Sequence, residues 1–272
     1  GPRGREEAVE TDVGVVVRPQ SPPEQLRRAV ELAESSGVRD VWLWEDCFLQ
    51  GGLTSAAAAL AWSTSLEVGI GLLPVPLRNP ALAAMEIAGV ARMFPGRLTV
   101  ALGHGIQDWM AQAGARVDSP MTLLREHAAA VMDLLAGQRL TVHGRYVRLD
   151  GVALDWPPVV PPVVLIGARG PRTVSLAGEI ADGVLLDSIT DPEVVTRARG
   201  LVDQARADAG RPGRGLVYAY TELDPTVAPA GLAAQVDAWA ARLVAAGADR
   251  VIVQPTGEHP DPAPLLAAVS PG

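Results

Sequence analysis

The sequence predicts a (β/α)8 TIM barrel, a closed ring of eight parallel strands in which each strand is followed by a helix. Short apolar runs alternate with amphipathic helical stretches along the chain, which is typical of a parallel sheet with crossover helices. Eight such units in 272 residues, of which 48% are hydrophobic, suit the size of this barrel. An open doubly wound sheet would place its glycine-rich turn after the first strand. Here that turn follows the fifth strand.

The first four units fill the first half of the chain. The expected strands are residues 13–17, 41–44, 66–72 and 97–102. The expected helices begin at Ser21 or Pro22, at Thr54, at the Asn79-Pro80 pair and at the Ser119-Pro120 pair. Polar residues that precede a proline suit a helix N-cap followed by the first helical position. The segment between the fourth strand and its helix, residues 103–119, is expected to be a long loop.

The second half continues the alternation after one insertion. Residues 140–154 hold two short alternating runs, which predict a small hairpin between strands four and five. The remaining strands are expected at 163–166, 184–186, 216–220 and 250–254, with helices from 171, 192, 232 and 262. Residues 1–11 are polar and aperiodic, so we expect a flexible N-terminal segment. We expect residues 12–272 to form a single domain.

Composition narrows the class of partner. The net charge of −8 argues against a nucleic acid or an anionic membrane surface, and no apolar run is long enough to span a bilayer. Cys47 is the one cysteine, which excludes an internal disulfide and a cysteine-based zinc site. No pair of histidines has ligand spacing, so no metal site is predicted. We expect a cytoplasmic protein, and the absence of lysine is typical of a GC-rich bacterial genome.

The stretch 163–177 carries the clearest functional pattern. A buried-strand signal runs into small residues, and a helix then starts at Pro171; the turn consists of Gly167, Ala168, Arg169 and Gly170. The free N–H groups and dipole of a helix start favour an anion, and Arg172 adds a positive charge. The pattern suits a phosphate cradle. From these residues alone, a plain β-to-α turn is an equal alternative.

Other strand ends should meet this loop at one rim of the barrel. Glu45 and Asp46 end the second strand, and because they are adjacent, only one can face a pocket. His104 ends the fourth strand and suits proton transfer, or else a bond to a backbone carbonyl. Glycines would let a flat ring approach the backbone; they are Gly71, Gly103 and Gly105.

Four further residues are candidates for the substrate pocket. Trp44 and Trp109 could form the walls around an aromatic ring, or they could pack in the core. Gln107 and Asp108 follow His104 on the same loop and could contact a substrate. Cys47 is interpreted as a small buried hydrophobe rather than a nucleophile.

The motifs together resemble the luciferase-like superfamily of flavin- and deazaflavin-dependent oxidoreductases. They are G-I-G-L-L-P-V-P-L-R-N-P-A at 69–81, R-M-F-P-G-R-L-T-V-A-L-G-H-G at 92–105, the hairpin region at 140–149, G-A-R-G-P-R at 167–172 and A-D-G-V-L at 181–185. The resemblance runs from about residue 12 to 189. It implies a barrel with an inserted segment, the deazaflavin F420 or FMN as cofactor, and a homodimer.

The resemblance also implies roles for single residues. The cofactor-phosphate loop would comprise Gly167, Ala168, Gly170, Pro171, Arg172 and Thr173. A cis peptide at Gly71–Leu72 would face the cofactor ring. The family's F420-dependent sugar-phosphate dehydrogenases have a histidine and a glutamate where this chain has Asp46 and Ile106, so their activity is not transferred.

We therefore predict F420-dependent hydride transfer to or from a small organic substrate, with His104, Asp46 or Glu45 moving the proton. The alternative is an FMN-dependent monooxygenase that receives reduced flavin from a partner reductase. A flavin-binding relative without turnover also stays open, because the acid/base pair is replaced.

Overall fold

The described part of the computed structural model, residues 12–270, is a closed barrel of eight parallel strands. Around the ring the order is β1, β2, β3, β4, β7, β8, β9 and β10, and β10 pairs again with β1. Their bounds are Val13–Val16, Asp40–Leu43, Glu67–Pro74, Leu98–Gly103, Val163–Ala168, Gly183–Leu186, Leu216–Glu222 and Arg250–Gln254. The predicted fold class is confirmed.

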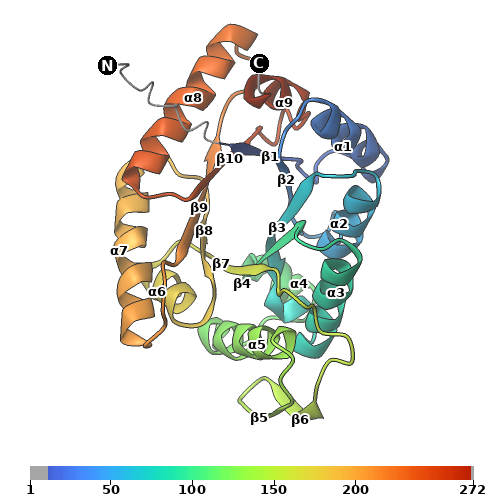
Figure 1. Ribbon diagram of the computed structural model, residues 1–272, viewed down its shortest axis with the longest axis vertical. Helices are drawn as coiled ribbons and strands as arrows, with labels where there is room; N and C mark the ends of the chain where they lie inside the picture. The colour runs from blue at the N-terminus through green and yellow to red at the C-terminus, as the bar shows by residue number, and fades with distance from the viewer. Residues whose placement is uncertain (1–11, 271–272) are drawn as a thin grey trace, which may run out of the picture.

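Helices surround this ring on the outside (Figure 1). They are α1 Leu26–Ser35, α2 Gly52–Ala61, α3 Pro80–Met93, α5 Pro120–Leu135, α6 Pro171–Ile180, α7 Pro192–Asp208, α8 Pro229–Ala246 and α9 Ala263–Val269, with two short 3-10 turns at Pro23–Gln25 and Val75–Leu77. Three of the predicted caps are present: Asn79, Ser119 and Asp191 accept from the N–H groups of Ala81, Thr122 and Glu193. The helix expected from Thr54 begins at Gly52 instead, and the turn after Pro22 has no side-chain cap. Polar side chains before prolines therefore do start helices in this chain.

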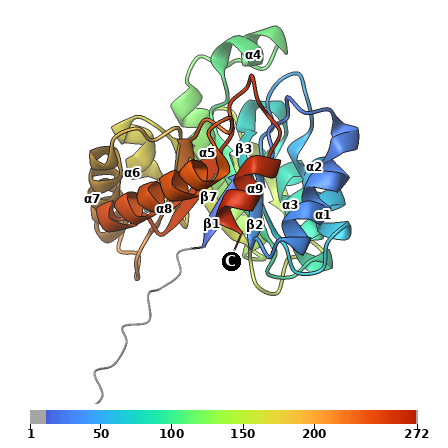
Figure 2. The same ribbon diagram turned by 90° about the horizontal axis from the view of Figure 1, so that it is seen from above.

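Two segments depart from the simple repeat. The predicted hairpin is present as β5 Leu140–His143 and β6 Arg148–Val152, and it lies outside the ring beyond α5 (Figure 1). The segment expected to be only a loop contains the short helix α4, Gln107–Gln112. This helix stands apart from the helices around the barrel (Figure 2). It starts without a side-chain cap at Ile106, so the sequence has no start signal there.

The core has two parts because alternate strand residues point to opposite faces. A small cluster fills the barrel interior: Val16, Trp42, Ala101, Leu165, Leu185, Tyr220 and Ile252. A larger cluster lies between strands and helices. Trp42 meets Tyr218 and Tyr220 edge-on at ring-centroid distances of 5.9 and 6.0 Å, so the interior is a packed core that supports the rim.

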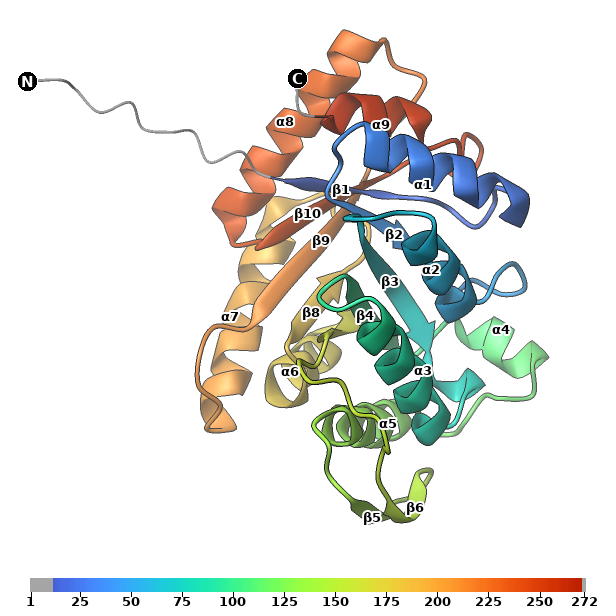
Figure 3. The same cartoon turned by 45° about the vertical axis from the view of Figure 1, so that its right-hand side comes forward.

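The end of the chain closes the ring of helices. The last helix, α9, packs against α8, α1 and β1, as Figure 3 shows. Within residues 12–270, none of the helices combines the length and the apolar character that crossing a bilayer requires. The first eleven residues, predicted to be a flexible segment, lie outside the described residues.

Candidate active site

A cavity of about 510 Å³ lies at the carboxyl ends of the strands. This is the end at which barrel enzymes bind their ligands. Its lining comes from six strand ends and their loops: Trp44, Glu45, Asp46, Gly71, Leu72, Pro74, His104, Gly105, Ile106, Trp109, Gly167, Ala168, Arg169, Gly170, Thr173, Leu185, Asp187 and Tyr220. Most residues predicted for the site are therefore gathered in one place.

The cavity floor is formed by an irregular part of β3. The Gly71–Leu72 peptide is cis, as predicted, and the pairing with β4 shifts between Gly71 and Leu73. The Leu72 side chain lies across the neighbouring strands: a Cβ on Gly103 or Gly167 would come within 2.5 or 2.6 Å of it. Gly103 thus makes room for Leu72 and is not in the cavity lining, although it was expected to lie against a ring.

Glu45 and Asp46 have different surroundings, as their adjacency requires. Glu45 is buried; its Oε1 accepts from Arg78 at 2.5 Å, and its Oε2 accepts from the N–H of Gly52 at 2.6 Å. Asp46 has no such partner among the described residues and is only partly buried. Burial raises the pKa of Asp46; the charge of Arg18 opposes this shift and that of Asp187 adds to it. Asp46 is therefore the carboxyl group of the two that is free to exchange a proton.

A second carboxylate, Asp187, follows the last residue of β8 and lines the same cavity. Arg169 from the β7–α6 loop donates to it through Nε at 2.9 Å and also through its terminal nitrogen. Among the described residues of the lining, Arg169 is the one permanently charged cation, and it is engaged in this pair. The cavity thus has no free arginine for an anionic substrate.

The β7–α6 loop presents small residues to the cavity. Gly167, Ala168 and Gly170 belong to the lining, and Gly170 caps α6 without any side-chain hydrogen bond. Pro171 and Arg172 instead line a neighbouring groove of about 520 Å³ between α5 and α6. Successive helix residues are about 100° apart, so Thr173 faces the cavity while exposed Arg172 does not.

His104 lies at the same end of the cavity. Its Nε2 is 3.3 Å from Thr173 Oγ1, whereas its buried Nδ1 has no hydrogen-bond partner in the described structure. Burial lowers the pKa of His104, and the nearby Pro120 carbonyl opposes that shift. The ring is therefore neutral at pH 7 and is linked to the first turn of α6.

The substrate-pocket candidates divide into two pairs. Trp44 and Trp109 line the cavity, but Gln107 and Asp108 do not. The amide of Gln107 points back to the carbonyls of His104 and Gly105, at 3.4 Å each, and Asp108 is exposed. Both differences follow from α4, whose turn directs only one side toward the barrel. Within residues 12–270, no three potential metal-binding side chains of His, Cys, Asp or Glu converge.

Sequence reasoning missed three residues of this region. Tyr220 donates to the carbonyl of Gly71 at 3.3 Å beneath the floor. Arg18 stacks on Trp44 with its guanidinium carbon 4.8 Å from the ring centroid. Arg78 holds Glu45. Arg78 stood inside the resemblance motif at 69–81, but its partner is 33 positions away, so spacing alone gave no signal.

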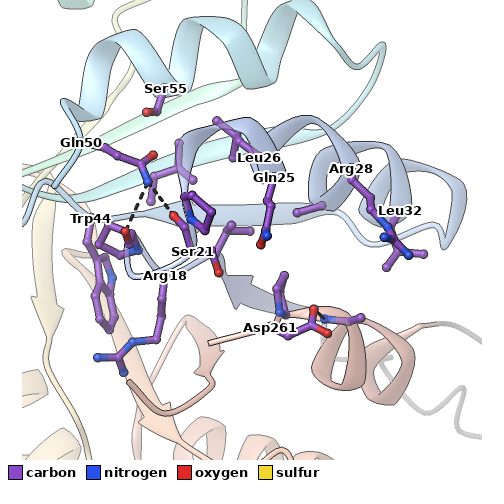
Figure 4. A pocket seen from close by; sticks show the side chains of 17 residues that line it. Arg18, Ser21, Gln25, Leu26, Arg28, Leu32, Trp44, Gln50, Ser55 and Asp261 are labelled. Atoms are coloured by element: carbon purple, nitrogen blue, oxygen red, sulfur yellow. Dashed lines mark hydrogen bonds between the residues drawn. The ribbon is translucent and has the colours of Figure 1, made fainter. Parts of the chain in front are cut away.

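A second cavity of about 370 Å³ lies beside α1. Trp44 lines both cavities, and Figure 4 shows Trp44 and Arg18 together at one end of this cleft, with Asp261 across from α1. Gln50 closes its upper wall by donating to the carbonyls of Pro19 and Ser21 at 3.3 and 2.8 Å. Trp44 thus stands between the barrel mouth and the side cleft.

Comparison with known proteins agrees with this geometry. The luciferase-like monooxygenase family matches residues 8–245. The chain belongs to that family. This luciferase-like protein is 28% identical over 251 residues, 91% of the chain and 75% of the relative, to the 5,10-methylenetetrahydromethanopterin reductase of Methanolobus tindarius. It is 30% identical over 207 residues, 70% of the chain and 60% of the relative, to the F420-dependent glucose-6-phosphate dehydrogenase of Microbacterium testaceum.

Solved structures share the fold. An F420-dependent secondary alcohol dehydrogenase bound to an F420–acetone adduct superposes with a TM-score of 0.79 at 18% identity, over 96% of this chain and 97% of that one. The FMN-bound oxygenating constituent of 3,6-diketocamphane monooxygenase from Pseudomonas putida superposes with a TM-score of 0.75 at 14% identity, over 96% of this chain and 97% of that one. At these identities the likeness shows the luciferase-like fold alone. Several curated relatives are longer: the chain spans 54–62% of five of them.

Proposed function

We propose that this protein is an F420-dependent oxidoreductase that transfers a hydride to or from a small, uncharged organic substrate. The observation that carries the proposal is the single cavity in which the β3 floor, the β4 end and the β7–α6 loop meet. The curated relatives named for F420 or for a methanopterin reductase support the choice of cofactor.

The residues present fit a phosphorylated tricyclic cofactor. Gly170 starts α6 without a side-chain cap, and a Cβ there would meet no atom within 4 Å. The first N–H groups of the helix are therefore accessible to an anion. His104 and Thr173 bring polar side chains to the same end of the cavity, with His104 Nε2 3.3 Å from Thr173 Oγ1. The hydrophobic Leu72 and Trp44 offer flat apolar surface for a ring system.

When bound, F420 supplies the carbon that accepts or donates the hydride. The chain's part is to bind and orient both molecules and to manage the proton. If the substrate is an alcohol, the Asp46 carboxylate would accept its hydroxyl proton during oxidation, and the Asp46 carboxyl group would return that proton during reduction. The raised pKa of Asp46 brings it closer to working pH, which improves a general acid or base.

The uncharged substrate follows from the charges around the cavity. Arg169 is paired with Asp187, Arg78 with Glu45, and Arg18, which stacks on Trp44, with Glu222. Asp46 adds negative charge. A phosphorylated substrate would therefore meet repulsion without a free arginine to bind it. Trp109 and exposed Ile106 favour an apolar body for the substrate.

Titration of the purified protein tests the proposal. We expect F420 to bind with micromolar affinity or better, followed by the change in its fluorescence, and FMN to bind more weakly. Tight binding of reduced FMN, together with oxygen consumption and no F420 binding, would instead establish the flavin monooxygenase that the family's name and the FMN-bound neighbour favour. Such a monooxygenase would need a partner flavin reductase. Binding of neither cofactor refutes both.

We propose further that the protein is a cytoplasmic homodimer. Leu82, Met85 and Met93 of α3 are exposed by 47, 61 and 65%. Arg92 of the same helix stacks on exposed Trp156 and donates to the carbonyl of Pro157 at 2.9 Å, so the apolar segment 156–160 adjoins this face. Contiguous exposed apolar surface is typical of interfaces. Sedimentation velocity should give a dimer for the native chain and a monomer for Met85→Arg; a native monomer contradicts the proposal.

A further inference from the structure

Trp44 lies between two cavities. It lines the cavity of about 510 Å³ at the barrel mouth and the side cleft of about 370 Å³ beside α1, and among the described residues it is the one that lines both. The strand register explains this position. Val16 of β1 pairs with Trp42 of β2, and Trp42 fills the barrel interior. Because every second strand residue points to the same face, Trp44 continues the interior side just beyond β2. Its indole is a wall that the two cavities share.

Two neighbours hold this wall in place. Arg18 stacks on the indole with its guanidinium carbon 4.8 Å from the ring centroid, and Tyr220 meets it edge-on at a centroid distance of 5.7 Å. Arg18 is itself fixed, since it donates to the carbonyl of Pro255 at 2.9 Å and lies 3.5 Å from Glu222. Only 13% of its side chain is exposed. The indole therefore separates the cavities from a packed position.

The side cleft is suited to an apolar chain. Buried side chains of α1 and β2 form part of its lining, namely Leu26, Ala29 and Leu43. The charged side chains of Arg28 and Asp261 lie away from Trp44, as Figure 4 shows. Its volume falls within the range of ligand pockets. Without the indole, the barrel mouth and the cleft would form one passage.

The substrate side of the mouth is the side that Trp44 borders. In the proposed function, the cofactor occupies the β3 floor, the β4 end and the β7–α6 loop. The rest of the mouth lies between β2 and β8, which are four strands apart in the ring of eight and so on opposite sides of it. Asp46 and Asp187 come from these two strand ends and line the cavity. A substrate that exchanges its proton with Asp46 therefore lies close to Trp44, two positions earlier in the chain.

We propose that Trp44 determines the length of substrate that this protein accepts: the indole closes the side cleft, so that a compact uncharged molecule fits and one with a long unbranched apolar chain does not. Arg18 is the positioning residue that keeps the indole in the closing position. This inference rests on the proposed function, because it concerns the substrate of the same cavity.

A homologous series of uncharged probes tests the inference. Dissociation constants of the 2-alkanones from butanone to 2-nonanone are measured by isothermal titration calorimetry with oxidised F420 present, so that no turnover occurs. Each methylene that enters an apolar space should raise the affinity about fourfold. We expect the native protein to show this rise over the first members of the series and no further gain beyond a limiting length.

Variants at the wall should move the limiting length. Trp44→Ala should let the rise continue to the longest member, because the chain enters the cleft. Trp44→Phe, which has a smaller ring, and Arg18→Met, which removes the stacking cation, should each move the limit toward longer members. Trp109→Ala is the matched control, since Trp109 lines the mouth but not the cleft. It should change all affinities by a similar factor and leave the limiting length as in the native protein.

Circular dichroism checks that each variant is folded. Truncating a packed tryptophan leaves a void that lowers stability, so Trp44→Phe keeps the test decisive if Trp44→Ala does not fold.

The possible failures are distinguishable. The inference is wrong, while the proposed function stands, if the native affinity rises without a limit, if neither variant of Trp44 moves the limit, if Trp109→Ala moves it as far, or if no member binds to any of these proteins. If F420 does not bind, the proposed function fails, and the series is measured on the protein alone. A native limit that the Trp44 variants move would then still support the indole as the wall, and an unmoved limit would overturn it.

Discussion

Replacing Arg78 by methionine should destabilise the protein severely, since it removes the cation that neutralises buried Glu45. Two hydrogen bonds join the pair, at 2.5 and 3.2 Å, and the side chains are 16% and 7% exposed. Breaking a buried pair from one side costs about 3–5 kcal/mol, because a charge is left without its partner. Arg78 also contacts Glu86 at 3.3 Å, so Glu45 and Glu86 would both lose the guanidinium as a partner.

We take about 3 kcal/mol as the expected loss, because Arg78 retains some contact with water and Glu45 keeps the N–H of Gly52. For a domain of this size, that loss lowers the unfolding temperature by roughly 6–12 °C. Urea unfolding followed by circular dichroism measures the free energy, and a thermal scan measures the temperature. The exposed Arg27–Glu31 pair provides the matched control, where Arg27→Ala should cost less than about 1 kcal/mol.

A double variant isolates the cause. In Glu45→Gln with Arg78→Met, no buried charge remains at this position, so much of the lost stability should return. If Arg78→Met costs no more than the Arg27→Ala control, or if the double variant is less stable than Arg78→Met alone, the buried ion pair is not what holds the 44–52 loop against the β3–α3 connection.

Three other predictions use different parts of the molecule. Burial lowers the pKa of His127 from 6.5 to about 4, so the unfolded chain binds a proton at a higher pH than the folded protein does. The free energy of unfolding should therefore fall by about 3 kcal/mol between pH 7 and 4. Urea unfolding at each pH should show that most of this loss is absent in His127→Gln. Asp46→Asn should reduce F420-dependent turnover by roughly 10²–10⁴-fold while the F420 dissociation constant changes less than threefold; equal turnover by the variant would exclude Asp46 as the proton carrier. Gly183→Ala places a Cβ 2.0 Å from the Leu216 carbonyl oxygen and should lower the free energy of unfolding by about 1–3 kcal/mol. Gly200→Ala, which has open space around it in α7, should be neutral or stabilising. Equal free energies of unfolding for the two variants would contradict the packing at Gly183.

The sequence predicted the architecture because its signals are local. Each barrel strand is a short apolar run, and the helix starts at Asn79, Ser119 and Asp191 depend on neighbours a few positions away. Where a local signal was weak, the prediction failed. Helix α4 has six residues and no capping side chain, so nothing distinguished it from a loop, and the roles expected for Gln107 and Asp108 depended on that loop.

The sequence predicted which residues meet at one rim of the barrel better than it predicted where their side chains point. Strand ends had to converge, so Asp46, His104 and the β7–α6 loop were found. The direction in which each side chain points depends on partners far along the chain. Glu45 is held by Arg78 and His104 by Thr173, 69 positions away, and Arg172 faces outward because of its place in the first turn of α6. Such pairings have no signature in spacing.

The contrast between residues 45 and 46 has a consequence for how this barrel could acquire new reactions. Glu45 holds the loop through its ion pair with Arg78 of the β3–α3 connection, and Asp46 has no side-chain partner among the described residues. A substitution of Asp46 would therefore alter reactivity without displacing the loop. The same substitution of Glu45 would break the contacts that hold this wall of the pocket. Variation that explores chemistry should concentrate at the second position and spare the first.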